Sequence, residues 1–362
     1  MATFINETLG MLNPKDFLST GFQNVARPAD PLEGLFTDQT TDNLVAEYYT
    51  MQSQYNIPQV AQFHAFDVPA QKSIPAPIDE HNVEKGLIKT KRPTSELLRE
   101  LIGKGVREES ALYDKVMNFA ADLADQVVTR TKVARAEVLA TGQFTINEND
   151  INITVDYGVP EANKSLTLDL GEGADDDILS QMQDIIDMAT DAGVTITGMI
   201  CARSTLTKLR KNKEVQKVIN GVNMSGILVS NSQLRAWLTE EFGITQVIVD
   251  DMTYSLPYEL DAHGRPQVRS QRYFPKGKVT FFGTSNGMKL GAGLWGAPPE
   301  EELAGYYDKS GSSSVSPYVY MTQWIETDPA ILWTKASALY VPVLFSPNSL
   351  YIATIKETPA SA

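Results

Sequence analysis

A long, uninterrupted helical pattern over residues 108–141 constrains this fold more than any other feature of the sequence. Its apolar side chains recur mostly at helical spacing, at Leu112, Val116, Phe119, Leu123, Val127, Ala134 and Val138. About 34 residues at about 1.5 Å each give a helix of roughly 51 Å, and Gly142 is the expected C-terminal glycine. Because helices in globular proteins usually have about 8 to 20 residues, we expect a strut rather than one layer of a compact domain.

The segments before this helix are expected to be extended. Residues 1–56 are polar, weakly periodic and interrupted by prolines, which predicts an arm with one short helix over residues 42–51. Residues 57–68 alternate imperfectly between apolar and polar side chains, and a second strand-like run begins at Gly86. We therefore predict a two-stranded excursion over residues 57–92. Since an isolated hairpin is marginally stable in water, this excursion needs another surface to lie on.

The rest of the chain predicts a mixed α+β fold. A hairpin is expected over residues 143–158, with its turn at 147–150, because both of its strands alternate. A helix is expected after the acidic run 175–177 and a buried strand over 194–202, and this alternation is typical of mixed domains. Residues 316–355 are rich in aromatic and apolar side chains, so the last strands must return to a core.

One motif imitates a cofactor site. The segment Gly291-Ala292-Gly293-Leu294-Trp295-Gly296 matches the dinucleotide fingerprint, which needs a strand before it and a helix after it to hold the pyrophosphate. The residues that follow include two prolines and then three glutamates, which predict no amphipathic helix and would repel phosphate. A dinucleotide-dependent enzyme is therefore the least favoured alternative, and we expect no bound cofactor.

No catalytic or metal-binding constellation is expected elsewhere in the sequence. The aspartates at 175–177 would point in different directions on a helix, and the three histidines are far apart. The single cysteine, Cys201, lies in an apolar run, which indicates a buried small hydrophobe. A secretory leader and a run of about 18 apolar residues are both absent from the sequence, so we expect no membrane span. The protein is predicted not to be an enzyme.

Charge limits the kinds of partner. With 31 Lys and Arg against 45 Asp and Glu, the net charge is −14, which argues against a broad phosphate-binding face. Two local basic runs remain. One lies at the base of the excursion, and the other surrounds a short helix near residues 208–217. A solvated helix face explains the second run most simply. The functional alternative for both runs is a surface that pairs with another copy of this acidic chain.

Several short segments, taken in order, resemble one protein family. They are AEVLATG at 136–142, VDYG at 155–158, YFP and GKV within 273–279, LG and WGAPPE within 290–300, ETDP at 326–329 and VPV at 341–343. With these segments, which lie between residues 130 and 355, the chain resembles the lambda-type major capsid protein E family of tailed phages, with the Hong Kong 97-type capsid fold. In that family the glycines at 291–296 belong to a structural segment rather than to a cofactor loop.

The resemblance implies a division of the chain. Residues 1–56 would be an N-terminal arm, and residues 57–92 would be the E-loop. Residues 93–174 would form the P-domain, with the long helix as its spine. Residues 175–320 would form the A-domain, which meets its symmetry mates at the capsomer centre. Residues 321–362 would be C-terminal strands that return to the P-domain.

The resemblance also implies the function. Hexamers and pentamers of the chain would close into an icosahedral head shell around double-stranded DNA, without sequence-specific binding and without a membrane. Its other partners would be a portal, a separate scaffolding protein and, in some phages, a decoration protein. The protein would be assembled in the host cytoplasm and reside in the virion. A shell around protein cargo, as in encapsulins, is the alternative. The expected contacts between subunits are Lys85, Lys89, Lys91, Arg92, Phe63, Phe66, Lys208, Arg210 and Lys211.

Overall fold

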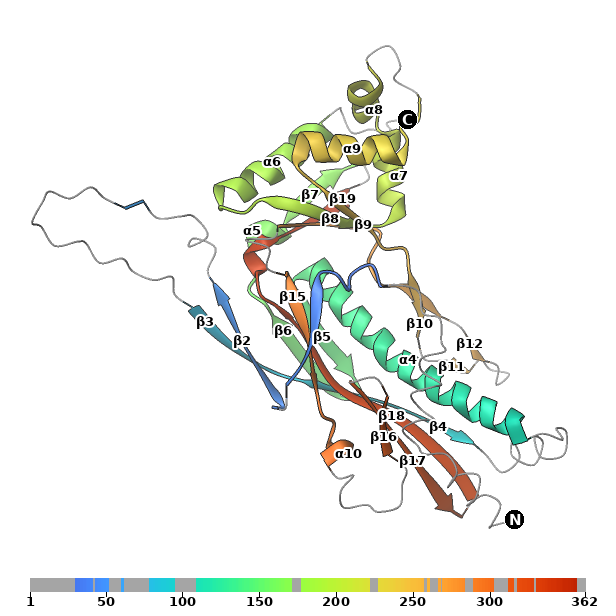
Figure 1. The fold of residues 1–362 in the computed structure, drawn as a ribbon. Helices are drawn as coiled ribbons and strands as arrows, with labels where there is room; N and C mark the ends of the chain where they lie inside the picture. Colours follow the sequence, from blue (N-terminus) through green and yellow to red (C-terminus); the bar gives the residue numbers. More distant parts are fainter. Residues whose placement is uncertain are drawn as a thin grey trace, which may run out of the picture.

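Two β-sheets and one long helix make up the body of the chain in the computed structural model, and a narrow two-stranded ribbon projects to one side (Figure 1). Each sheet takes strands from distant parts of the sequence. The structure describes residues 30–41, 43–51, 60–61, 78–94, 109–170, 177–221, 227–256, 259–260, 266–267, 269–283, 289–302, 312–315, 318–328 and 330–356.

The helix α4 (Glu109–Thr141) has 33 residues and begins one residue after its predicted start. Its last two turns are enclosed, because Ala136, Val138, Leu139 and Ala140 are each at most 2% exposed. Gly142 follows with a φ of 72°, a left-handed conformation that ends the helix and that glycine adopts without strain. The helix α4 therefore packs against strands of both sheets.

The first sheet packs its face against α4. Its order is β1-β15-β18-β17-β16, and β4 pairs with the free side of β18 along part of that strand's length. The pairing of β1 with β15 is parallel, whereas the other pairings in this sheet are antiparallel. Its strands are β1 (Phe36–Thr40), β4 (Gly86–Thr94), β15 (Gly291–Gly296), β16 (Ser312–Val315), β17 (Val319–Thr327) and β18 (Ala330–Leu344).

The second sheet lies at the other end of the molecule, under a group of helices (Figure 1). Its order is β7-β19-β14-β8-β9. The strands are β7 (Leu166–Asp169), β8 (Ile196–Cys201), β9 (Gln246–Val249), β14 (Lys278–Gly283) and β19 (Leu350–Lys356). The helices are α5 (Glu161–Lys164), α6 (Ile178–Asp191), α7 (Arg203–Lys211), α8 (Lys213–Asn220) and α9 (Asn231–Phe242).

The last strand differs from its predicted place. The sequence predicts that residues 321–362 return to the sheet beside the long helix, and β17 and β18 do lie there. The strand β19 instead crosses to the second sheet, between β14 and β7. Its residues Leu350 to Ala353 are all at most 1% exposed, and a strand buried on both faces requires a central position with cover above and below.

The projecting ribbon is β2 (Val45–Met51) paired antiparallel with β3 (Ile78–Glu84). The short helix predicted over 42–51 is therefore wrong. Valine, tyrosine and threonine favour a pleated strand, and alternate residues Ala46, Tyr48 and Thr50 are buried. The predicted strand over 57–68 lies outside the described residues, apart from 60 and 61. The run from Gly86 forms β4, which belongs to the first sheet.

Four short strands, one hairpin and two short helices complete the described elements. The strand β5 pairs with β6, with the turn residues Asn149 and Asp150 at positive φ, and the pairs β10–β13 and β11–β12 lie on the side of α4. Their bounds are β5 (Gln143–Glu148), β6 (Ile151–Asp156), β10 (Thr253–Ser255), β11 (Glu259–Leu260), β12 (Pro266–Gln267), β13 (Ser270–Arg272), α10 (Pro299–Glu302) and η4 (Pro347–Ser349).

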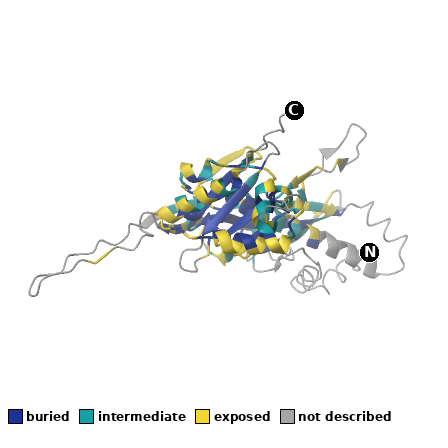
Figure 2. Cartoon of the chain, turned by 90° about the horizontal axis from the view of Figure 1, so that it is seen from above, coloured by how far each residue is buried: buried dark blue, intermediate teal, exposed yellow. Residues whose placement is uncertain are grey.

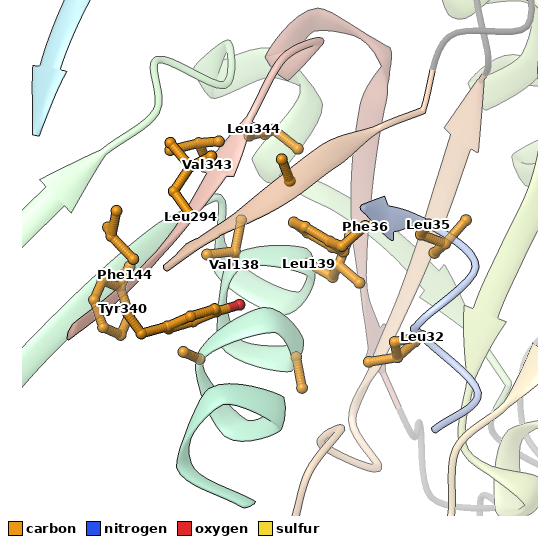
Figure 3. Packing of buried hydrophobic residues seen from close by; sticks show 14 of the residues in the cluster. Leu32, Leu35, Phe36, Val138, Leu139, Phe144, Leu294, Tyr340, Val343 and Leu344 are labelled. Atoms are coloured by element: carbon orange, nitrogen blue, oxygen red, sulfur yellow. The ribbon is translucent and has the colours of Figure 1, made fainter. Parts of the chain in front are cut away.

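Two hydrophobic cores correspond to the two sheets. In the first, the end of α4 packs on β15 and β18, and the segment before β1 adds Leu32, Leu35 and Phe36; Figure 3 shows the Phe36 ring beside Leu139. The second core lies between the second sheet and helices α6 to α9. Seen from above, the strands are dark blue while the outer faces of the helices are yellow (Figure 2). These helices therefore present a solvent-facing surface in the isolated subunit.

The glycine motif at 291–296 forms the strand β15, not a phosphate loop. Its residues Gly291 to Trp295 are buried, and its backbone pairs with β1 on one side and β18 on the other. A Cβ on Gly293 would come within 2.5 Å of Asp38 Oδ1, so the glycine is needed for close packing. Among the described residues, no helix could cross a membrane and no cluster of three or more His, Cys, Asp or Glu side chains could hold a metal.

Candidate assembly interface

The base of the ribbon is held by one buried lysine. Lys85 connects β3 to β4 and is 3% exposed. Its Nζ donates hydrogen bonds to the carbonyl oxygens of Thr41 at 2.7 Å, Asn43 at 2.6 Å and Trp295 at 3.2 Å. These carbonyls belong to the segment between β1 and β2 and to the end of β15. Lys85 therefore fixes the direction in which the ribbon leaves the sheet, and its ammonium is buried within its own chain rather than exposed for the predicted contact between subunits.

The ribbon has an inner face packed on its own chain. The Tyr48 ring stacks on His81 with centroids 5.2 Å apart, and Thr50 Oγ1 lies 2.8 Å from His81 Nε2. Tyr48 also contacts Tyr157 on the body of the molecule, at 6.4 Å between ring centroids. Burial raises the pKa of Tyr48 to about 12, so this hydroxyl stays neutral.

The outer face of the ribbon carries exposed apolar and acidic side chains. Tyr49 is 60% exposed, Val45 is 41% exposed, and the preceding Leu44 is 51% exposed. Val45 pairs with Glu84 and Tyr49 with Glu80, so these apolar side chains lie among carboxylates on a two-stranded element that is marginal alone. Figure 1 shows that the ribbon extends away from both sheets. This face is the first candidate surface for contact with another molecule.

The segment that leads into the ribbon is anchored by Arg135 of α4. Arg135 Nη2 forms a very short ion pair with Asp38 Oδ1, and its Nη1 lies 3.9 Å from Asp30 Oδ2. Its Nε donates to Tyr340 Oη at 2.9 Å, and Trp295 Nε1 donates to Asp38 Oδ1 at 3.0 Å. Burial opposes the charge, but Tyr340 and Asp38 outweigh it and raise the pKa of Arg135. The network joins β1, α4, β15 and β18.

The other basic residues of the first run alternate along β4. Arg92 faces α4, where it pairs with Asp122 at 3.0 Å. Lys89 and Lys91 point to the opposite face of the sheet; Lys89 pairs with Glu300 at 2.9 Å, and the Lys91 Nζ lies 4.5 Å from the centre of the Trp333 ring. Each has a partner in its own chain and remains partly exposed, so these residues can still take part in assembly.

The second basic run lies far from the first, on α7 and α8 over the second sheet. Arg210 Nε donates to the carbonyl of Val229 at 2.5 Å, which ties α7 to the segment before α9. Lys208 is half-buried and Lys211 is exposed. The structure therefore does not bring the two predicted runs together. Phe63 and Phe66, also predicted as contacts, lie outside the described residues.

Comparison with known proteins decides what such a subunit is. The sequence profile of phage major capsid protein E matches residues 23–355. The chain belongs to this family. A phage-related protein from Bordetella bronchiseptica has the same fold at a TM-score of 0.53, with 9% identity over 94% of this chain and 96% of that one.

Two further solved structures resemble this major capsid protein. The capsid of cyanophage A-1(L) gives a TM-score of 0.47 with 13% identity, over 91% of this chain and 94% of that one. A candidate capsid protein of an E. coli prophage gives 0.49 with 15% identity, over 77% and 80%. No curated protein sequence matches significantly.

Family membership settles several expectations from the sequence. The mixed α+β fold of the Hong Kong 97 type is confirmed, and so is the function of a phage major capsid protein. Since the family consists of structural proteins of the shell, the chain is not an enzyme, and its place is the virion shell. The major capsid protein is a self-assembling subunit, so its exposed surfaces carry its function.

Sequence reasoning missed two features of the major capsid protein that bear on assembly. It did not identify the outer face with Val45 and Tyr49, although these residues alternate with Ala46 and Tyr48 and could have indicated a strand. It also missed Arg135, because the sequence pattern places this residue among the charged side chains on the exposed faces of the long helix. Only its position opposite Asp38, 97 residues earlier, shows that it is buried.

A carboxylate on α10 gives the first testable prediction. Glu300 Oε1 accepts from Lys335 at 2.8 Å and pairs with Lys89 at 2.9 Å. Burial would raise its pKa, but hydrogen bonds from Lys335 and Lys89 outweigh this and lower the pKa of Glu300 to about 2. A lowered pKa in the folded state stabilises the fold above the ordinary value near 4.5, and this contribution disappears as the pH falls toward 2.

We therefore expect Glu300→Gln to lower the free energy of unfolding by about 1 to 2 kcal/mol at pH 7, allowing for solvent screening. The deficit relative to wild type should shrink as the pH is lowered from 5 toward 2. Urea titrations of the unassembled subunit at several pH values measure it. Glu240→Gln on the exposed face of α9 is the control and should cost less than about 0.5 kcal/mol. A deficit for Glu300→Gln that does not vary with pH would contradict this account.

Proposed function

We propose that this major capsid protein assembles as hexamers and pentamers that close into an icosahedral shell around double-stranded DNA. We also propose that the β2–β3 ribbon reaches onto a neighbouring subunit. The exposed side chains of Leu44, Val45 and Tyr49 on the projecting ribbon are the observation that carries the second proposal. A ribbon that projects from its own subunit gains cover only from another molecule, and a repeated head-to-tail contact can close into rings.

The fold suggests revised limits for the parts of the subunit. We assign the E-loop to residues 45–84, because β4 belongs to the first sheet rather than to the excursion. The P-domain then consists of α4 with the first sheet, and the A-domain of the second sheet with α6 to α9. The strand β19 joins the A-domain, and the residues before β2 form the arm that Arg135 holds to the P-domain.

The net charge supports the proposed relation to DNA. At −14 the subunit offers weak attraction to phosphates, so the shell would retain the polymer by closure rather than by adhesion. We propose a separate scaffolding protein and a portal as further partners, with a decoration protein as an optional addition. Assembly would take place in the host cytoplasm before the DNA enters.

The ribbon provides the direct test of assembly. Val45 and Tyr49 lie on the exposed face of β2, so Val45→Lys with Tyr49→Lys changes that face and leaves the buried residues of the strand in place. We expect this double variant to fold with an unchanged body but to form no capsomers or shells. Negative-stain electron microscopy and light scattering of wild type and variant, prepared in parallel, give the answer.

A control isolates the loss of contact from a loss of stability. Val45→Ile with Tyr49→Phe keeps these side chains apolar and should assemble like wild type. Both variants should unfold within about 1 kcal/mol of wild type, since neither alters the buried residues Ala46, Tyr48 and Thr50. Shells of normal size from Val45→Lys with Tyr49→Lys would overturn the proposed role of the ribbon.

A further inference from the structure

The helices over the second sheet divide their charge unevenly. Helices α7 and α8 together carry six basic residues and one acidic residue, Glu214. Helix α6 carries three acidic residues and no basic ones. Figure 1 places α6 at one side of this group of helices and α7 at the other, with α9 between them. The start of α6 contacts α8, where the Leu179 backbone N–H donates to Glu214 at 3.4 Å, but Asp187 and Asp191 lie at the other end of α6. One subunit therefore presents opposite charges at two separate places on the same domain.

The acidic residues of α6 form one stripe. Asp184, Asp187 and Asp191 are exposed and spaced three and four residues apart, so they share one face of the helix. Asp187 and Asp191 lie near the C-terminus of α6, where the helix dipole disfavours negative charge, and the last turn has no basic residue to offset them. Gln183 donates to Asp187 at 2.8 Å within the helix, but this bond needs no charge, so the stability of α6 does not explain the negative charge of the stripe.

The basic side shows the opposite arrangement. Lys213 opens α8, where the helix dipole disfavours positive charge, and it is exposed. Lys211 is exposed two residues earlier, and Asn212 between them caps α8 by accepting from the backbone of Glu214 and Val215. The turn that presents both lysines is therefore fixed in place, although Lys213 gains nothing from its own helix.

An apolar rim accompanies the lysines. Val218 on α8 is 50% exposed, and Ile227 and Leu228, which follow this helix, are 56% and 51% exposed. The Asn220 side chain donates to the carbonyl of Ile227 at 2.9 Å, which ties the end of α8 to the segment that carries Ile227 and Leu228. Exposed apolar residues beside fixed charges are typical of a surface that a partner covers.

We propose that this basic and apolar side of α7 and α8 docks on the aspartate stripe of α6 in a second copy of the chain. The charges are complementary, and the two surfaces are distinct, so the contact is head-to-tail and repeats around a ring. The proposal rests on the proposed assembly into capsomers and identifies one contact within them. Lys211 and Lys213 set the register against Asp187 and Asp191.

Charge reversal tests the contact, and its effects on the two helix dipoles oppose each other, since Lys211→Glu is unfavourable at the end of α7 and Lys213→Glu is favourable at the start of α8. We expect Lys211→Glu with Lys213→Glu to raise the concentration needed for capsomers at low salt by about tenfold or more. Asp187→Lys with Asp191→Lys should do the same, although it improves the match to the dipole of α6 and should leave the melting temperature unchanged or higher. The matched control, Lys211→Arg with Lys213→Arg, keeps the charge and should assemble like wild type. Analytical ultracentrifugation measures all four proteins.

Mixing the two reversed variants gives the sharpest readout. Each variant repels itself but attracts the other, so an equal mixture should recover rings in which the two alternate. Alternation closes only in rings with an even number of subunits. The mixture should therefore form hexamers while pentamers, which contain at least one repulsive contact, stay rare. Native mass spectrometry counts the subunits.

Three outcomes would overturn the proposal in distinguishable ways. If wild type forms no capsomers, the proposed function fails. If wild type and both reversed variants assemble at the same concentration, the function stands and this contact does not exist. If only the lysine variant fails and mixing does not rescue it, the basic side meets a different partner, such as nucleic acid or an acidic scaffold, and the aspartate stripe is not its target.

Discussion

Arg135→Leu is expected to lower the free energy of unfolding by about 3 to 5 kcal/mol. Arg135 is 4% exposed and pairs with Asp38, while Asp30 lies on its other side. Its removal would leave both carboxylates beside an apolar side chain, and the hydroxyl of Tyr340 would lose its donor. A domain is typically stable by only about 5 to 15 kcal/mol, so this loss is a large share of the total. Chemical unfolding of the unassembled subunit measures it.

A double variant separates the buried charge from the lost packing. Arg135→Leu combined with Asp38→Asn removes one of the stranded carboxylates and should recover at least about 1 kcal/mol relative to Arg135→Leu alone. Arg135→Lys keeps the charge but loses the forked geometry, so its loss of unfolding free energy should be smaller than that of Arg135→Leu. A loss below about 1 kcal/mol for Arg135→Leu would mean that the network does not hold the segment before the ribbon.

Lys85→Met is expected to cost about 2 to 3 kcal/mol of folding free energy and to abolish shell formation even where the subunit remains folded. The three carbonyl oxygens that receive its ammonium would lose this donor in a buried site. Because two of them lie between β1 and β2 and one ends β15, the ribbon would lose its fixed direction. A small change of angle at the base moves the far end of the ribbon away from its neighbour.

Two measurements identify this effect. Urea unfolding gives the stability, and hydrogen exchange should show faster exchange in β2 and β3 than in α4. Lys89→Met is the matched control for stability, because Lys89 is exposed and Glu300 keeps Lys335; it should cost less than about 1 kcal/mol. Normal shells from Lys85→Met would show that the ribbon finds its place without the lysine.

Local patterns explain which parts of the fold could be predicted. The helix α4 and the hairpin of β5 and β6 each depend on periodicity within one continuous segment, and the sequence places both within a residue or two. The pairing of β2 with β3 is harder to predict, because the two strands are separated by 26 residues and their pairing depends on register rather than on local preference. The glycine motif at 291–296 misleads for the same reason, since only the neighbours β1 and β18 show that it is a buried strand.

The candidate site could be predicted only in outline. Lysine is almost always exposed, so nothing in the sequence near Lys85 indicates that its ammonium lies among carbonyls from residues 41, 43 and 295. The run that includes Lys208, Arg210 and Lys211 is recognisable as basic from the sequence, but the complement that we propose for it on α6 is not. Which residues meet between subunits depends on two surfaces whose placement follows from the tertiary fold.

The order in which the ribosome makes the strands has a consequence for the timing of assembly. The strand β18, which pairs with β4, β15 and β17, is made after all three, and β15 is made long after its partner β1. The strands β1 and β4 therefore wait for their partners, and pairings so distant in sequence form slowly. Until β18 is made, the ribbon proposed to reach a neighbour lacks the sheet to which its base is joined. We therefore expect a nascent chain not to join a growing shell before β18 has been made.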